Sequence, residues 1–91
     1  MLLGWSPESL GDLDRLYAFL AAVNPVVAGK AVRELVMAAE VLREHPRMGE
    51  QLSRYDPREV RRLIVSRYEL RYEVVGENLY ILRLWNTRET R

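Results

Sequence analysis

The chain has 91 residues, of which 48% are hydrophobic and 30% are charged, and its formal net charge is +1. This length predicts one domain that covers residues 1–91. No apolar run reaches about 18 residues, so we expect no membrane span and no membrane partner, and the first residues lack the features of a secretory signal. There is no cysteine and only one histidine, His45. We therefore expect no disulfide, no metal site, no cofactor and a cytoplasmic location.

Charge is spread unevenly along the chain. Residues 1–53 carry five basic and seven acidic side chains, whereas residues 54–91 carry nine and six. Every basic residue except Lys30 is an arginine, whose planar guanidinium suits phosphate and carboxylate groups. A GC-rich genome would explain the preference for arginine. It would not explain why the arginines gather in the C-terminal half.

The first half of the chain predicts a short strand followed by a helical hairpin. Residues 2–5 are apolar and indicate the strand. Ser6-Pro7 and Asn24-Pro25 both indicate helix starts, because a capping side chain is followed by proline at the first helical position. An apolar stripe at helical spacing follows each start. Its members are Leu10, Leu13, Leu16, Tyr17 and Leu20 in the first helix, and Ala28, Ala31, Val32, Leu35, Ala39 and Leu42 in the second. Pro46 ends the second helix by about His45, so two antiparallel helices share a very short connection.

Residues 46–57 indicate a loop, after which the hydrophobic period changes to two. Residues 60–65 and 68–75 predict two strands, and the turn at 76–78 leads to a third strand over residues 79–86. In the middle strand, alternation places the apolar side chains on the helices and leaves Glu69, Arg71 and Glu73 open to water or a partner. The order β-α-α-β-β-β predicts an α+β fold, with the helical hairpin packed on one face of a small antiparallel sheet.

Five segments, in this order, are similar to the RelE/ParE superfamily of toxins from bacterial type II toxin–antitoxin systems. They are WSPESLGDL, NPVVAGKAVREL, LREHPRMGE, VRRLIVSRYELRYEV and LYILRLWNTRE. Together they cover nearly the whole chain, and the Asn-Pro turn of the hairpin looks more like the ParE branch than RelE. The resemblance implies a growth-inhibiting toxin, of a class associated with plasmid stabilization. It also implies a small antitoxin that wraps and neutralises the toxin in a hetero-oligomer.

The resemblance leaves two classes of target open. ParE-type members poison DNA gyrase by binding it, whereas RelE-type members cut messenger RNA in the ribosome. RNA cleavage needs cations that stabilise the phosphorane and groups that transfer protons. Arg88 and one of Arg61 and Arg62, which point to opposite faces of a strand, lie near basic positions of the nucleases. These three residues, with Arg83 and Asn86, are the candidates for binding a target or a phosphate.

Three departures from the nuclease pattern favour the gyrase-binding class. Glu69 occupies the position of a nuclease arginine, and its carboxylate would repel phosphate. Asn86 stands where many relatives carry histidine, and an amide does not transfer protons at neutral pH. His45 lies far along the chain from these residues, where we expect a cation at a helix C-terminus. We predict a ParE-like toxin without catalysis of its own and assign no catalytic residue. An RNA endonuclease is the alternative, and a member that has lost toxicity is the third.

The last strand carries two arginines with different expected roles. Arg83 stands between Leu82 and Leu84, so we expect it to have a carboxylate partner. Arg88 follows the last apolar residue, Trp85, and would contact an acidic antitoxin, a target protein or phosphate. We expect the antitoxin to dock on the apolar surface of the hairpin and on an open sheet edge, with an amphipathic, acidic tail.

Overall fold

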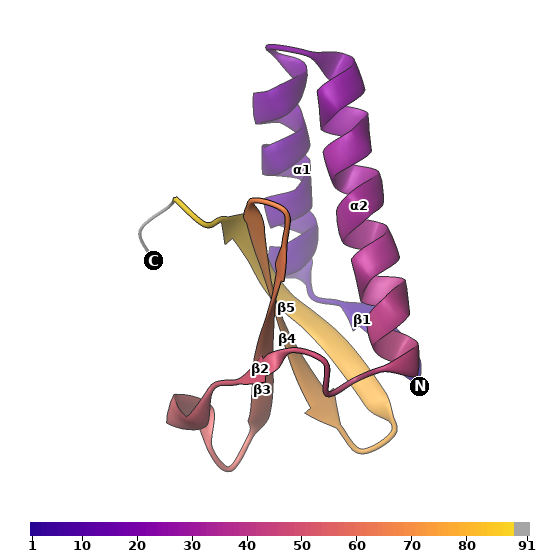
Figure 1. The fold of residues 1–91 in the computed structure, drawn as a ribbon, viewed down its shortest axis with the longest axis vertical. Helices are drawn as coiled ribbons and strands as arrows, with labels where there is room; N and C mark the ends of the chain where they lie inside the picture. Colours follow the sequence, from indigo (N-terminus) through magenta and orange to yellow (C-terminus); the bar gives the residue numbers. More distant parts are fainter. Residues whose placement is uncertain (89–91) are drawn as a thin grey trace.

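The structure of the chain is a computed structural model, and it describes residues 1–88. Two helices, α1 (Pro7–Ala21) and α2 (Pro25–Glu44), form one layer, and a five-stranded sheet forms the other (Figure 1). The strands are β1 (Leu2–Trp5), β2 (Glu50–Gln51), β3 (Glu59–Val65), β4 (Tyr68–Val75) and β5 (Asn78–Asn86), and a 3-10 turn, η1 (Ser53–Tyr55), precedes β3. This arrangement confirms the expected α+β fold. Neither helix in the described part of the chain is long and apolar enough to span a bilayer.

The sheet differs from the expectation in two ways. Its order is β1-β5-β4-β3-β2, and β1 runs parallel to β5 while the other neighbours are antiparallel. The sheet is therefore mixed rather than antiparallel, because β1 and β5, which are far apart along the chain, lie side by side and run in the same direction. The second difference is β2, which lies inside the predicted loop. Its two residues are too few to show an alternating pattern.

The predicted helix starts are confirmed by their hydrogen bonds. Ser6 Oγ accepts from the N–H of Ser9 at 3.0 Å, and Asn24 Oδ1 accepts from the N–H of Val26 at 3.0 Å. Both helices begin at a proline, which loses no hydrogen bond at this position. The second helix ends at Glu44, with His45 as its C-cap, one residue before the proline.

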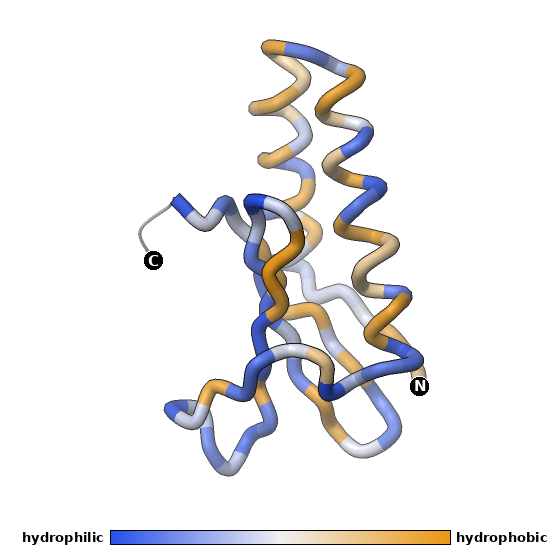
Figure 2. The backbone as a smooth tube through the Cα atoms, viewed as in Figure 1, coloured by the Kyte–Doolittle hydropathy of each residue, from blue (hydrophilic) through white to orange (hydrophobic). Residues whose placement is uncertain are grey.

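One face of the sheet and the inner sides of the helices enclose the core. Ala28, Leu35 and Ala39 of α2 are fully buried, and the two alanines allow α1 to approach closely. The buried side chains of the sheet on this face include Leu70, Tyr72, Val74, Leu79, Ile81 and Leu84. Hydrophobic and hydrophilic residues alternate along both helices (Figure 2). The predicted stripe of α1 is only partly confirmed, because Leu10 and Tyr17 are exposed while Leu13, Leu16 and Leu20 pack on the core.

The first turns of α1 complete the edge of β5. The short strand β1 pairs with β5 only as far as Trp5 and Ile81. Beyond this pair, Ser6 N–H donates to the Ile81 carbonyl at 3.0 Å, and Ser6 Oγ donates to the Leu82 carbonyl at 2.8 Å. Asp12 then accepts from the N–H of Leu84. The helix thus satisfies backbone groups that an exposed edge would leave unpaired.

Candidate functional site

Arg83 is bound to a buried carboxylate of α1. Its Nε and Nη2 donate to the two carboxylate oxygens of Asp12, at 2.8 and 3.0 Å, in a bidentate pair. Asp12 is 2% exposed, and it also accepts the N–H of Leu84 at 3.0 Å. Burial alone would raise the pKa of Asp12, but the hydrogen bonds from Arg83 and Leu84 lower it below its ordinary value. The expected carboxylate partner is confirmed, and Arg83 connects β5 to α1.

We expected the side of β4 that carries Glu69 to be open to water or a partner, but other residues of the chain cover Glu69. Glu69 is 7% exposed, and Arg71 Nη2 donates to its Oε2 at 2.6 Å. The guanidinium of Arg71 lies 4.6 Å from the centre of the Trp85 ring, and its Nη1 donates to the Tyr55 hydroxyl at 2.9 Å. We call these four residues the Arg71 cluster. Glu69 and Trp85 are buried, and Arg71 and Tyr55 are partly buried. The segment η1 brings Tyr55 onto this face, which the alternation of β4 cannot reveal.

Tyr55 is the residue of this region that sequence reasoning missed. Besides Arg71, its ring has the guanidinium of Arg54 at 5.1 Å and that of Arg58 at 6.0 Å from its centre. Burial alone would raise the pKa of Tyr55, but a hydrogen bond with Arg54 and the charge of Arg71 lower it below the ordinary value. The sequence signal was weak, since a tyrosine within a loop is common. The stretch RYDPR, which places two arginines around it, was the available hint.

Arg61 and Arg62 are neighbours on β3, and each is held by carboxylates. Arg61 Nε donates to Glu59 Oε2 at 2.8 Å. The hydrogen bond from Arg61 is the main reason why the pKa of Glu59 is lowered. Arg62 Nη2 donates to Glu50 at 3.2 Å, and its Nη1 lies 3.7 Å from a carboxylate oxygen of Glu69. Neither arginine therefore offers an uncompensated charge to a phosphate.

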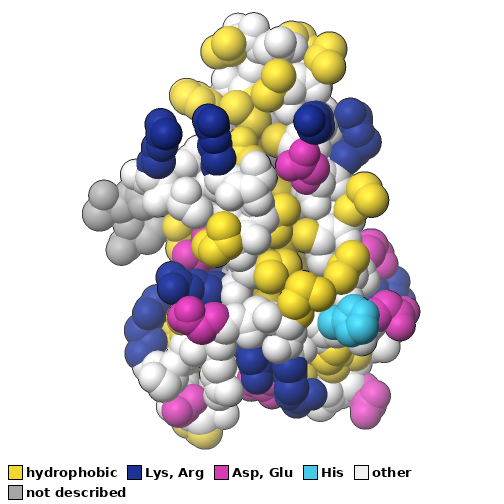
Figure 3. All heavy atoms as spheres, in the orientation of Figure 1, with side chains coloured by type: hydrophobic (Ala, Val, Ile, Leu, Met, Phe, Trp, Pro, Cys, Tyr) yellow, Lys and Arg dark blue, Asp and Glu magenta, His cyan; other side chains and the backbone are white. Residues whose placement is uncertain are grey.

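Asn86 and Arg88 lie together at the free end of β5. The backbone N–H of Arg88 donates to Asn86 Oδ1 at 2.9 Å, and the N–H of Thr87 donates to the carbonyl of Arg67 at 2.8 Å. The turn between β3 and β4 therefore lies beside the end of β5. No carboxylate among residues 1–88 forms an ion pair with Arg67 or Arg88. We call these two arginines the basic tip, and Figure 3 shows Lys or Arg side chains beside the C-terminus.

The five candidate residues do not form one site. Strand β4 separates β3, which carries Arg61 and Arg62, from β5. Arg83 is engaged by Asp12 in α1. The structure brings together only Asn86 and Arg88 of the five, and it leaves the other three in separate ion pairs.

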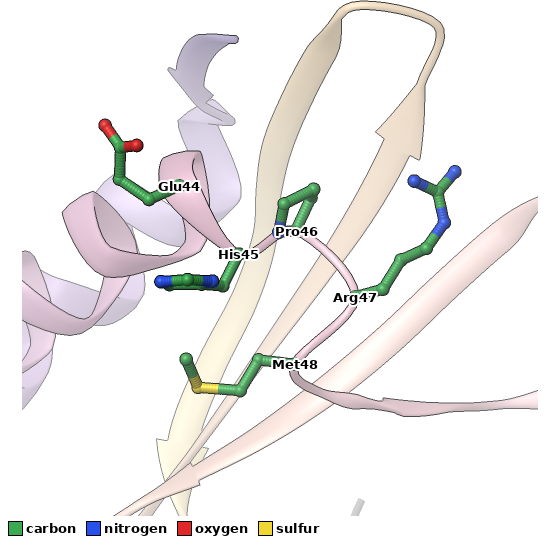
Figure 4. Close-up of a pocket in the computed structure, with 5 residues that line it drawn as sticks. All are labelled: Glu44, His45, Pro46, Arg47 and Met48. Carbon is green, nitrogen blue, oxygen red and sulfur yellow. The ribbon is translucent and has the colours of Figure 1, made fainter.

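A hollow of about 600 Å³ lies where α2 ends, and it does not assemble a catalytic pair. It is lined by Glu44, His45, Pro46, Arg47 and Met48. Figure 4 shows Glu44 and Arg47 pointing away from each other, with His45 and Met48 on one side of the loop. Within residues 1–88, no group of three histidine, cysteine or acidic residues is arranged to hold a metal ion. The role of His45 as a cation at the helix end stays a prediction.

The fold and these surfaces define a small α+β protein in which most strand arginines are paired internally and a basic tip faces outward. The chain belongs to the ParE toxin family: the family described as "ParE toxin of type II toxin-antitoxin system, parDE" matches residues 3–91. The predicted membership of the RelE/ParE superfamily, in its ParE branch, is confirmed.

Similar structures agree with this family. Nine chains of solved structures match, and one of them is described as "Chromosomal ParDE TA system from P. aeruginosa". It shares 27% identity with this chain, with a TM-score of 0.76, and the match covers 94% of this chain and 95% of that one. A search of curated proteins finds no match.

Proposed function

We propose that this toxin inhibits growth by binding DNA gyrase and that it has no catalysis of its own. Glu69 supports this proposal most strongly. It stands where nucleolytic relatives carry an arginine, and it is buried between Arg71 and Arg62 at 2.6 and 3.7 Å. A phosphate would meet a carboxylate there, and the two arginines beside it are already paired. A toxin that acts by binding gyrase does not need a group of free cations to hold a phosphate.

A ribosome-dependent RNA endonuclease is the second candidate, and Tyr55 is the observation that favours it. A phenol of lowered pKa beside arginines is a possible general base for a 2′-hydroxyl. The surrounding charges argue against this role. Arg71 and Arg58 are held by Glu69 and Glu73, so the cluster offers few free cations to stabilise a phosphorane.

We further propose that an antitoxin neutralises the toxin in a hetero-oligomer. The relative from P. aeruginosa is described as part of a ParDE system. In this chain, β2 pairs only with Arg61 and Arg62, so no strand of the described residues covers the outer edge of β3 from residue 63 to 65. Ile64 is 53% exposed in this stretch, and Figure 3 shows a band of hydrophobic side chains running down this face of the molecule. An open edge beside apolar side chains suits an added strand.

Two assays on purified toxin separate the candidate targets. The first measures supercoiling of relaxed plasmid DNA by gyrase, and the second follows messenger RNA on translating ribosomes. We expect inhibited supercoiling and intact messenger RNA. Specific cleavage of the messenger RNA with unaffected gyrase would reverse the order of the two candidates. Both targets and the antitoxin would place the toxin in the cytoplasm.

Co-purification tests the antitoxin. The toxin is expressed with a tag beside the small reading frame that neighbours its gene. We expect the two proteins to elute as one complex in size-exclusion chromatography. A toxin that elutes alone, while the neighbouring protein is expressed and folded, would remove the proposed partner.

A further inference from the structure

A groove separates α1 from the last residues of β5, on the side of the sheet away from the open β3 edge. Its volume is about 260 Å³. The residues that line it are Asp12, Arg15, Leu16, Phe19, Leu20, Leu84, Trp85 and Asn86. Most of this lining is apolar, although the groove lies beside charged residues. The contacts between α1 and β5 described above are structural, and none of them gives the groove a role.

The groove has a fixed floor and one exposed wall. Leu16, Leu84 and Trp85 are buried in the protein, whereas Phe19 is 73% exposed. An exposed phenylalanine at the rim of an apolar groove gains the most when a partner covers it. The volume of the groove is smaller than that of usual small-molecule sites, which is about 300 to 1,000 Å³. It suits a bulky apolar side chain that projects from a partner protein.

The charge around the groove selects an acidic partner. Asp12 lines the groove, but its carboxylate is occupied by Arg83 and by the N–H of Leu84. Arg15 is half-exposed at the same place and forms an ion pair with the same carboxylate, with its Nη2 3.1 Å from Asp12 Oδ1. Asn86, also in the lining, accepts the backbone N–H of Arg88 in the basic tip. Two arginines, Arg15 and Arg83, thus face the one carboxylate in the lining, so the charge around the groove is positive on balance.

We propose that this groove binds a bulky apolar side chain carried on an acidic segment of the antitoxin. The inference rests on the proposed neutralisation by an antitoxin and adds a second contact to the strand pairing at β3. The groove lies beside β5 and the open edge belongs to β3, with β4 between them. A partner that occupies both would hold the toxin from two sides, and linked contacts strengthen each other through their effective concentration.

Two alanine variants of aromatic residues on α1 test the groove. Phe19→Ala removes the exposed wall, and Tyr17→Ala removes an exposed aromatic residue that does not line the groove. Affinity for the full-length antitoxin, encoded by the neighbouring reading frame, is measured by isothermal titration calorimetry. We expect Phe19→Ala to weaken binding about tenfold or more, as for an interface aromatic anchor, and Tyr17→Ala to change it less than about threefold. Both variants should keep the wild-type melting temperature, because both side chains are exposed.

A third variant tests the sign of the partner's charge. Phe19→Glu places a carboxylate at the rim, so it should weaken binding more than Phe19→Ala, and the difference should shrink in high salt. Equal affinities of Phe19→Ala and Tyr17→Ala would overturn the groove as an antitoxin site. A loss of growth inhibition by Phe19→Ala, with unchanged antitoxin affinity, would overturn it too and assign the groove to the target. If the wild-type toxin binds no antitoxin, the proposed neutralisation itself fails, and this inference fails with it.

Discussion

The ion pair between Arg83 and Asp12 predicts a large loss of stability in Arg83→Ala. The guanidinium makes two hydrogen bonds, at 2.8 and 3.0 Å, to a carboxylate whose side chain is 1% exposed. Removing one partner of a buried pair costs about 3–5 kcal/mol, because the remaining charge is stranded. Here the loss is smaller, since Leu84 and Arg15 still contact Asp12 and the Arg83 side chain is 40% exposed. We expect about 2 kcal/mol, which corresponds to a fall of roughly 10 °C in melting temperature for a domain of this size.

Arg58→Ala is a matched control for this prediction. Arg58 also makes two hydrogen bonds to one carboxylate, that of Glu73, at 3.0 and 2.9 Å. Its side chain is 54% exposed, and exposed ion pairs contribute little to stability because water and salt screen them. Thermal unfolding at pH 7, followed by circular dichroism, compares the two variants. Equal melting temperatures for Arg83→Ala and Arg58→Ala would refute the stabilising role of the pair between Arg83 and Asp12.

The same pair predicts a dependence on pH. The pKa of Asp12 is lowered in the folded protein, so the carboxylate stabilises the fold above its unfolded pKa, about 3.8 to 3.9. This contribution is lost as the pH falls through the lower, folded pKa. The difference in melting temperature between wild type and Arg83→Ala should therefore shrink when the pH is lowered from 7 towards 3. A constant difference over this range would contradict the ionised state of Asp12.

Three further predictions concern single residues. Arg88→Ala should change the free energy of unfolding by less than about 0.5 kcal/mol, yet lose toxicity or antitoxin affinity, as a growth assay and calorimetry would show. Glu69→Arg should not restore a nuclease site, because it would place a third guanidinium beside Arg62 and Arg71. We expect the free energy of unfolding, measured with denaturant, to fall by about 3 kcal/mol or more. A stable variant that cuts messenger RNA would contradict this. Gly49→Ala should cost about 1–3 kcal/mol, because a Cβ there would lie 2.6 Å from a backbone oxygen; an unchanged denaturation midpoint would count against it.

The features that the sequence predicted well are those with local signals. The caps at Ser6 and Asn24 follow from two dipeptides, and they fix where both helices begin. The alternation of residues 68–75 predicted β4 with its observed bounds. The hydrophobic residues of the α2 stripe are buried almost as expected, because a helix of this length presents one consistent face to the core.

The features that the sequence did not predict depend on contacts between distant residues. Arg83 was expected to have a carboxylate partner, but Asp12 lies 71 residues earlier, and no spacing rule connects them. The burial of Glu69 follows from η1, which places Tyr55 against Arg71. The parallel pairing of β1 depends on the path of the whole chain. Each of these contacts changes the role of an arginine or a carboxylate, so the candidate site was less predictable than the fold.

The structure shows that few arginines of the arginine-rich half of the chain are open to an anionic partner. By sequence, residues 54–91 have an excess of basic side chains, which suggests a broad anionic partner. In the structure, Arg58, Arg61, Arg62, Arg71 and Arg83 are all held by carboxylates. Among residues 54–88, the arginines without such a partner are Arg54 and the two of the basic tip. A partner bound at this tip would therefore neutralise few charges, so its affinity should fall only weakly with salt, unlike that of a nucleic acid held along the sheet.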